Sequence, residues 1–206
     1  MIKFPDPPEA YSIAVTVDEH LSYDDRRKVY FLCVYHPTRC SQAANHRDTQ
    51  MLLRLKDGDD DGINHYSFLI GQMIAGVVPP EWPILVVAMP SHQAEVPRRD
   101  CPLRRLIRAV PKFVDLSGCL VRRTTVPKAA RTWRGQRPDA ATHRMSMEAR
   151  LDGGRTVRGK HLLLLDDVVT TSATMLGASK VLLDAGAASV TRFALTNTQV
   201  PKGRRI

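Results

Sequence analysis

Apolar and polar positions divide most of this chain into short strands and amphipathic helices. Five apolar or β-branched runs are bounded by turn residues, as is typical of strands. In three other stretches, apolar residues recur at helical spacing. The expected strands are 28–35, 83–88, 118–121, 161–165 and 188–196, and the expected helices are 63–77, 98–110 and 173–185.

The order of these elements predicts an α/β protein. From residue 83 to 197 the chain reads strand, helix, strand, long loop, strand, helix, strand. Such alternation builds a central, mostly parallel sheet flanked by helices. We expect a small variable amino-terminal part or hood at residues 1–62, followed by a core at residues 63–206.

The most informative stretch runs from His161 to Thr174. Four leucines are followed by Asp166 and Asp167, and then by a hydroxyl-rich turn that leads into a helical pattern. A continuous apolar run is typical of a strand buried on both faces of a parallel sheet. We therefore expect both carboxylates at the carboxyl end of a central strand, which is the edge where open α/β sheets bind ligands.

The residue types in this stretch indicate a sugar-phosphate site. Adjacent carboxylates accept hydrogen bonds from ribose hydroxyls or help to hold Mg²⁺. The turn offers the hydroxyls of Thr170, Thr171, Ser172 and Thr174. It also offers backbone N–H groups, and the amino end of a helix favours a phosphate group.

This stretch resembles the 5-phosphoribosyl-1-pyrophosphate (PRPP) motif of type I phosphoribosyltransferases, and its turn is most similar to the ComF-type and orotate-type versions. The resemblance implies the type I phosphoribosyltransferase fold, Mg²⁺ as cofactor, and transfer of a phosphoribosyl group to a nitrogen acceptor with release of pyrophosphate. It assigns the ribose and the metal to Asp166 and Asp167. It assigns the phosphate to the following residues: Val168, Val169, Thr170, Thr171, Ser172, Ala173 and Thr174.

The chain departs from the family pattern at three points. Ser172 stands where the family usually has glycine, which lets the backbone approach a phosphate closely. Purine-salvage members usually have Asp at the position of Thr170, so its absence argues against hypoxanthine or guanine as the acceptor. ComF-type proteins often carry an amino-terminal zinc ribbon, and this chain has no Cys-x-x-Cys pair for one.

The resemblance also implies two loops that contact pyrophosphate. The first follows strand 83–88 and contains Pro90, Ser91 and His92, although His92 also fits an ordinary surface position. The second is a flexible hood within the polar region 124–150, where Trp133 fits either stacking on a base or packing of the closed loop. The basic residues expected to serve this flexible loop are Arg122, Arg123, Lys128 and Arg131.

Other interpretations of these motifs explain less. An apolar strand ending in two acids also resembles a Walker B strand, and Gly154 with Gly159-Lys160 matches part of a P-loop. However, His161 stands where a P-loop needs Ser or Thr, and a strand follows instead of a helix. A purely structural turn accounts for a capping hydroxyl but not for two adjacent aspartates. The acidic stretch 57–62 lacks the spaced ligands of a calcium loop and is expected to be a solvated turn.

Charge leaves a second function open. The chain of 206 residues has a net charge of +9, and residues 98–160 hold 17 Lys and Arg against 5 Asp and Glu. Such a segment needs an anionic partner, either PRPP and pyrophosphate or nucleic acid. The alternative function is therefore a non-catalytic nucleic-acid-binding or regulatory protein on the same fold.

Composition indicates in which cellular compartment the protein is expected. The four cysteines form no paired motif, so we expect reduced thiols in the cytoplasm. No apolar run reaches the length of a membrane span, and the first ten residues lack the pattern of a signal peptide, so no membrane partner is expected. A homodimer is left open as an assembly.

Overall fold

The structure is a computed structural model that describes residues 21–36, 46–75, 78–79, 81–94, 101–127, 138–150 and 156–198. Its centre is a six-stranded sheet in the order β1-β2-β8-β7-β3-β4. Neighbouring strands run parallel except for β1, which is antiparallel to β2. The strands are β1 (Ser22–Asp24), β2 (Val29–Tyr35), β3 (Ile84–Ala88), β4 (Phe113–Asp115), β7 (His161–Val169) and β8 (Ser189–Thr198).

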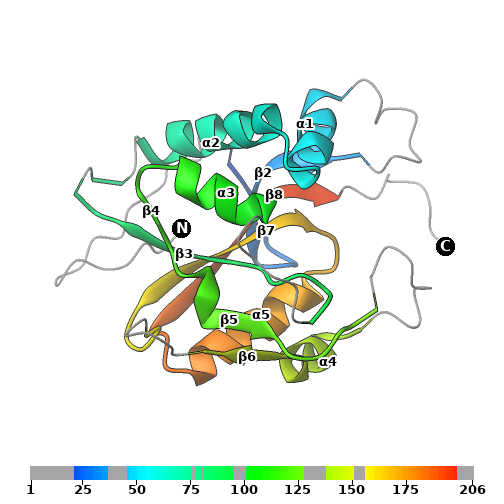
Figure 1. Cartoon of the computed structure of the whole chain (residues 1–206), viewed down its shortest axis with the longest axis vertical. Coiled ribbons are helices and arrows are strands. Elements are labelled where there is room, and N and C mark those ends of the chain that lie inside the picture. Colours follow the sequence, from blue (N-terminus) through cyan, green and yellow to red (C-terminus); the bar gives the residue numbers. More distant parts are fainter. Residues whose placement is uncertain are drawn as a thin grey trace.

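Helices cover both faces of this sheet (Figure 1). One face carries α1 (Arg47–Lys56), α2 (Asp60–Ala75) and α3 (Pro102–Ala109). The other carries α5 (Ala173–Asp184), the short α4 (Ala140–Met145), and a small antiparallel sheet of β5 (Leu120–Arg122) and β6 (Met147–Ala149). The predicted α/β fold with a mostly parallel central sheet and flanking helices is confirmed.

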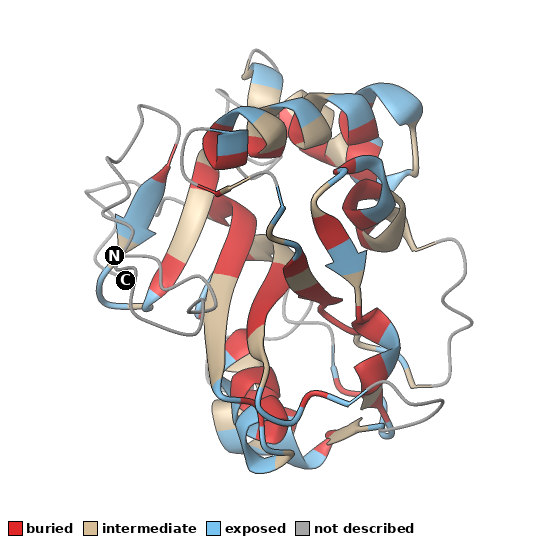
Figure 2. Cartoon of the chain, turned by 90° about the vertical axis from the view of Figure 1, so that its left-hand side faces the viewer, coloured by how far each residue is buried: buried red, intermediate tan, exposed pale blue. Residues whose placement is uncertain are grey.

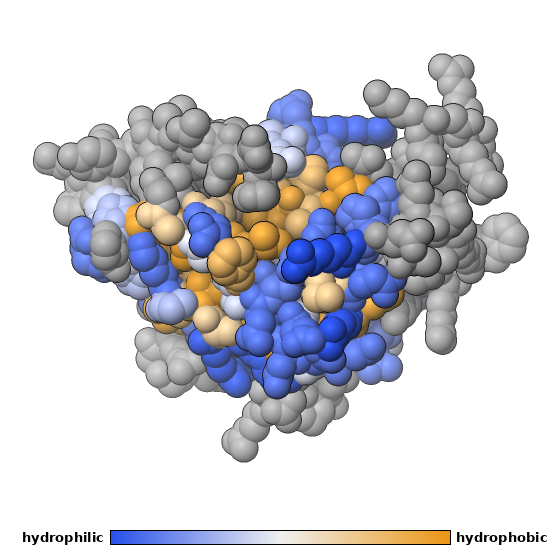
Figure 3. Space-filling model, turned by 90° about the horizontal axis from the view of Figure 1, so that it is seen from above, coloured by the Kyte–Doolittle hydropathy of each residue, from blue (hydrophilic) through white to orange (hydrophobic). Residues whose placement is uncertain are grey.

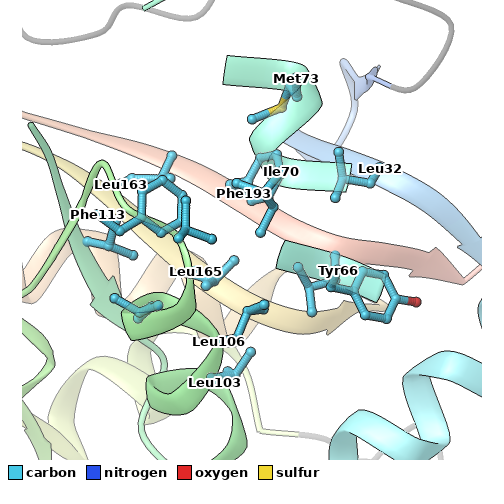
Figure 4. Packing of buried hydrophobic residues seen from close by; sticks show 14 of the residues in the cluster. Leu32, Tyr66, Ile70, Met73, Leu103, Leu106, Phe113, Leu163, Leu165 and Phe193 are labelled. Carbon is cyan, nitrogen blue, oxygen red and sulfur yellow. The ribbon is translucent and has the colours of Figure 1, made fainter. Parts of the chain in front are cut away.

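Alternation along β7 divides the core between the two faces. Leu163 and Leu165 pack with α1–α3, whereas Leu162 and Leu164 pack on the opposite side with α5. Successive side chains of a strand point to opposite faces, so an unbroken leucine run fills both layers. Figure 4 shows the α1–α3 side, and Figure 2 shows buried residues both on the strands and on the helices that cover them.

The outer surface over α1–α3 is mixed in character. Figure 3 views this side and shows apolar side chains beside hydrophilic ones. Phe68 on α2 is 63% exposed. In the described part of the chain, no helix is both long and apolar enough to cross a bilayer.

Several expected elements differ from those observed. The expected strand 118–121 does not join the central sheet, whose edge is formed by β4. Residues 120–122 form β5 and pair with β6 in a separate two-stranded sheet. Only the first half of the acidic stretch 57–62 lies in a turn, because α2 already begins at Asp60. The region 124–150, expected to be a flexible hood, contains α4 and β6 in its second half.

The amino-terminal part also joins the main sheet. β2 pairs with β8, and α1, which the sequence pattern did not suggest to us, packs against α2. The two helices approach so closely that a Cβ at Gly62 would lie 2.3 Å from the Leu55 nitrogen. The division of the chain at residue 62 stays a prediction.

Candidate functional site

The site predicted from the sequence lies where the order in which strands are added to the sheet changes direction. β3 leads through α3 to its neighbour β4, whereas β7 leads through α5 to its neighbour β8 on the opposite side. α3 and α5 cover opposite faces, so the loops after β3 and β7 separate. Ligands of open α/β sheets bind in the crevice at such a switch point, outside the carboxyl ends of the strands.

Asp166 and Asp167 border this switch point but do not end their strand. β7 continues to Val169 and stays paired with β8, whereas its pairing with β3 ends at Leu165. The expectation that the strand ends at the carboxylates is therefore corrected. Each carboxylate folds over the next peptide: Asp167 N–H donates to Asp166 Oδ1 at 3.0 Å, and Val168 N–H donates to Asp167 Oδ1 at 2.6 Å.

A lysine from α1 reaches this pair. Lys56 Nζ lies 3.2 Å from Asp167 Oδ2 and 5.9 Å from the centre of the Tyr35 ring. Burial of its carboxylate, with the nearby negative charge of Asp167, raises the pKa of Asp166 above its usual range, and the charge of Lys56 offsets only part of this. The site therefore holds a carboxyl that resists ionisation beside one that is already paired.

The turn after β7 leads directly into the amino end of α5. Ser172 is the residue before α5, it is buried, and it adopts a left-handed conformation with φ 60° and ψ 1°. Glycine adopts this conformation without strain, which accounts for glycine being usual at this position of the motif. Thr170 and Thr171 are exposed, and the first turn of α5 leaves N–H groups without intrahelical partners.

Thr174, in that first turn, contacts a histidine that the sequence did not suggest. Its Oγ1 lies 3.1 Å from Nε2 of His143, a residue of α4 that is only 5% exposed. Burial and the charge of Arg122 lower the pKa of His143, which therefore favours the neutral ring, while Asp139 acts in the opposite direction.

The loop after β3 begins beside the motif strand. Met89 N–H donates to the Leu165 carbonyl at 2.8 Å, which places the following residues next to the end of the β3–β7 ladder. Pro90 is buried, Ser91 is exposed and His92 is half-buried. Ser91 Oγ accepts the Gln93 N–H at 3.3 Å, so this hydroxyl already stabilises its own turn.

The two arginines expected in the flexible loop differ in environment. Arg122 is 3% exposed and fixed: its Nε donates to the Ser91 carbonyl at 2.5 Å. Its assignment to a flexible loop is therefore corrected, since its guanidinium is buried. Arg123 is exposed and pairs with Glu148. Lys128, Arg131 and Trp133 lie outside the described residues.

The donor set fits Mg²⁺ only together with a ligand. Within the described ranges, no group of three His, Cys, Asp or Glu side chains gathers into a metal cage. Mg²⁺ usually keeps several waters and binds through one or two carboxylates plus substrate phosphates. Asp166 and Asp167 supply that number of carboxylates, and a pyrophosphate group supplies the remaining charged oxygens.

Sequence reasoning missed Lys56 and His143 for different reasons. The spacing of Leu52 and Leu55 was the signal for α1, but nothing in the sequence indicates that α1 ends over the motif strand. His143 lay in a stretch too short and too polar to suggest a helix. Its signal was Asp139, whose side chain caps α4 by accepting the Thr142 N–H at 2.7 Å.

Comparisons with known proteins give similarity to solved structures only. No family model matches the chain, and no curated protein matches it. A hypoxanthine phosphoribosyltransferase from Staphylococcus aureus is 14% identical, with a TM-score of 0.40, and the match covers 70% of this chain and 66% of that one. A hypoxanthine phosphoribosyl transferase of Trypanosoma cruzi is 16% identical, with a TM-score of 0.36, covering 77% and 69%. Likeness at this level carries no information on activity.

Proposed function

We propose that this chain is a phosphoribosyltransferase-like protein that binds PRPP with Mg²⁺ and transfers the phosphoribosyl group to a nitrogen acceptor. The observation that carries the proposal is the position of Asp166 and Asp167 beside the β3–β7 switch point, followed by the left-handed turn at Ser172 and the amino end of α5. Carboxylates for a ribose and a turn for a phosphate then lie on consecutive residues of one strand–turn–helix unit.

The proposed reaction balances without an oxidant or a further co-reactant. The acceptor nitrogen forms a bond to the anomeric carbon of the ribose, the bond from that carbon to pyrophosphate breaks, and pyrophosphate leaves with the electron pair. The acceptor nitrogen then gives up a proton to solvent. Bound Mg²⁺ would supply positive charge to the leaving pyrophosphate.

Residues of this chain have separate tasks in the proposal. Asp166 and Asp167 accept hydrogen bonds from the ribose hydroxyls and face the metal. The backbone and hydroxyls of residues 168–174 hold the phosphate, and the loop of Pro90, Ser91 and His92 borders the pyrophosphate. Arg123, Lys128 and Arg131 are proposed to serve the pyrophosphate. The acceptor is left unassigned.

Nucleic-acid binding receives less support from the described residues. Six arginines between residues 98 and 160 pair with carboxylates, which offsets their charge locally. Arg122 in the same segment is buried. The six are Arg104, Arg105, Arg108, Arg123, Arg144 and Arg150.

The proposal is tested by replacing both site carboxylates. We expect Asp166→Asn with Asp167→Asn to lower the affinity for PRPP and Mg²⁺ at least tenfold, because each charge-assisted hydrogen bond contributes about 1.5–3 kcal/mol. Isothermal titration calorimetry measures this affinity. The protein should still fold, since the amides keep the shape of the carboxyls and Asp166→Asn replaces a group whose ionisation the folded protein opposes.

The matched control changes two carboxylates elsewhere. Asp25→Asn with Asp184→Asn makes the same chemical substitution at two exposed positions, whose side chains are 83% and 56% accessible. This control should bind PRPP as the wild type does. Equal binding by the site variant and the wild type would refute the assignment of the two aspartates, and absence of PRPP binding by the wild type would refute the function.

A further inference from the structure

Buried polar groups join the two loops that border the proposed site. Arg122 Nε donates to the Ser91 carbonyl at 2.5 Å, and its Nη1 donates to Ser146 Oγ at 2.5 Å. Ser146 Oγ in turn donates to the His143 carbonyl at 2.8 Å. The His143 ring then reaches Thr174 in the turn after β7, at 3.1 Å. The chain of contacts thus runs from the loop after β3 to the first turn of α5.

These groups are held in an otherwise apolar layer. Arg122, His143 and Ser146 are 3%, 5% and 4% exposed, in a part of the molecule whose buried side chains are mostly aliphatic. Burying an arginine and a histidine costs free energy that aliphatic residues of similar size would not cost. The arrangement therefore calls for a role beyond packing.

A glycine fixes the position of the histidine relative to α5. A Cβ at Gly177 would lie 2.8 Å from the Ala140 oxygen and 2.9 Å from the His143 Cβ. These distances are shorter than real Cβ contacts, so only glycine lets α4 approach this closely. The His143 ring is consequently pressed against the amino-terminal half of α5, where Thr174 lies.

The partners of the ring determine which nitrogen carries its proton. Nδ1 of His143 is buried and has no hydrogen-bond partner in the described part of the chain. A proton on Nδ1 would be a buried donor without an acceptor, which is costly. Nε2 faces the Thr174 hydroxyl, which can accept. The favoured neutral ring therefore carries its proton on Nε2 and donates it to Thr174 Oγ1.

We infer that His143 is a positioning residue for phosphate binding at the amino end of α5. Because its Nε2–H occupies a lone pair of Thr174 Oγ1, the hydroxyl hydrogen of Thr174 has to point elsewhere, and it is free to donate to a phosphate oxygen at the turn. With the opposite tautomer, Thr174 would donate to the ring and present only lone pairs to an anion. The inference rests on the proposed function in taking this turn as the phosphate subsite.

The test compares two replacements of His143 with inorganic phosphate as the probe. Glutamine carries an N–H group at a similar distance from Cα as Nε2, whereas leucine fills the space without a donor. We expect His143→Leu to weaken phosphate binding about five- to tenfold, which is less than the loss of a whole hydrogen bond to a charged group, because the Thr174 hydroxyl remains but is no longer held in one orientation. His143→Gln should stay within about twofold of the wild type, because it restores the donor.

A double-mutant cycle separates positioning from packing. Thr174→Val should weaken phosphate binding at least as much as His143→Leu, and adding His143→Leu to Thr174→Val should cause no further loss, because His143 acts only through the Thr174 hydroxyl. Thr174→Val alone keeps the test decisive if His143→Leu fails to fold, since phosphate affinity unchanged in Thr174→Val would overturn the inference. Equal losses in His143→Gln and His143→Leu would overturn it as well.

The outcomes also distinguish this inference from the proposed function. Suppose that the wild type binds PRPP and that replacement of Asp166 and Asp167 abolishes this binding. If His143→Leu then binds phosphate and PRPP normally, only the role of His143 is refuted. If the wild type binds neither phosphate nor PRPP, the proposed function and the subsite fall together. Calorimetry at fixed ionic strength, with thermal unfolding of each free variant, supplies both readouts.

Discussion

The two faces of the central sheet are covered by buried side chains of different polarity. On the side of α1–α3, side chains such as Tyr66, Ile70, Leu106 and Phe193 are nearly inaccessible and almost entirely apolar (Figure 4). On the side of α5, the aliphatic cluster shares its layer with the buried groups of Arg122, His143, Ser146 and Ser172.

This difference separates stability from positioning. Apolar burial is favourable in proportion to area and sets few orientations, so the α1–α3 side mainly stabilises the fold. Buried hydrogen bonds contribute little net free energy but fix directions, so the α5 side holds its loops in register at some cost in stability. Changes on the first face should therefore alter unfolding, and changes on the second should alter binding.

The largest effect is expected from the apolar face. Leu106 on α3 is fully buried, and Leu106→Ala should lower the free energy of unfolding by about 2–5 kcal/mol, through lost transfer energy and the cavity left behind. Urea denaturation measures this loss. At a temperature where the variant remains folded, its affinity for PRPP should match the wild type. A fall in affinity with unchanged stability would contradict the separation of roles.

A smaller effect for each pH unit is expected from titration, because the raised pKa of Asp166 links its ionisation to folding. Between about pH 4, the pKa of a free Asp, and its higher folded value, the folded protein keeps a proton that the unfolded chain has lost. The free energy of unfolding therefore falls as pH rises through that window, by at most about 1.4 kcal/mol per pH unit.

Asp166→Asn isolates the effect of Asp166 ionisation on the free energy of unfolding. The variant should be more stable than the wild type above that window, and the difference should vanish below it. Denaturation curves of both proteins across the pH range measure the difference, in which the lowered pKa values of Asp24, Asp48 and Asp115 cancel. Two parallel stability curves would show that Asp166 ionises normally in the folded protein.

The smallest effect is expected at Ser172. A non-glycine residue in the left-handed region costs about 1–2 kcal/mol, which glycine avoids. Glycine gives back about 0.5–1 kcal/mol of this advantage, because it has more conformational freedom to lose when the chain folds. Ser172→Gly should therefore stabilise the protein by roughly 0.5 kcal/mol. Ser172→Val, with a branched side chain at φ 60°, should destabilise it, and thermal unfolding of the pair gives the sign. Destabilisation by glycine would show that the Ser172 side chain contributes to the turn.

The sequence predicted best what depends on local periodicity. The leucine run of β7 and the spacing of α2 and α5 were sufficient to place the central strand and two helices, because burial imposes these patterns directly. β4 was missed since three residues are too few to show a pattern. The pairing of β5 with β6 depends on partners 25 or more residues apart, which local patterns do not encode.

The candidate site was predictable only in part for the same reason. Asp166, Asp167 and the turn are consecutive in sequence, so one motif identified them together. Lys56 meets Asp167 across 111 residues, and His143 meets Thr174 across 31. Such contacts follow from how α1 and α4 pack, in which Gly62 and Gly177 permit the close approaches.

The pairing of β2 with β8 has a consequence for how the protein is made. Tyr30 lies opposite Phe193, so β2 finds this partner only after 163 further residues have been synthesised. Contacts this distant in sequence carry a large loop-closure cost and slow the final step of folding. Until β8 arrives, the edges of β2 and β7 remain unpaired, and unpaired strand edges are prone to aggregation. A nascent chain stalled before residue 189 would therefore expose two unpaired strand edges at once.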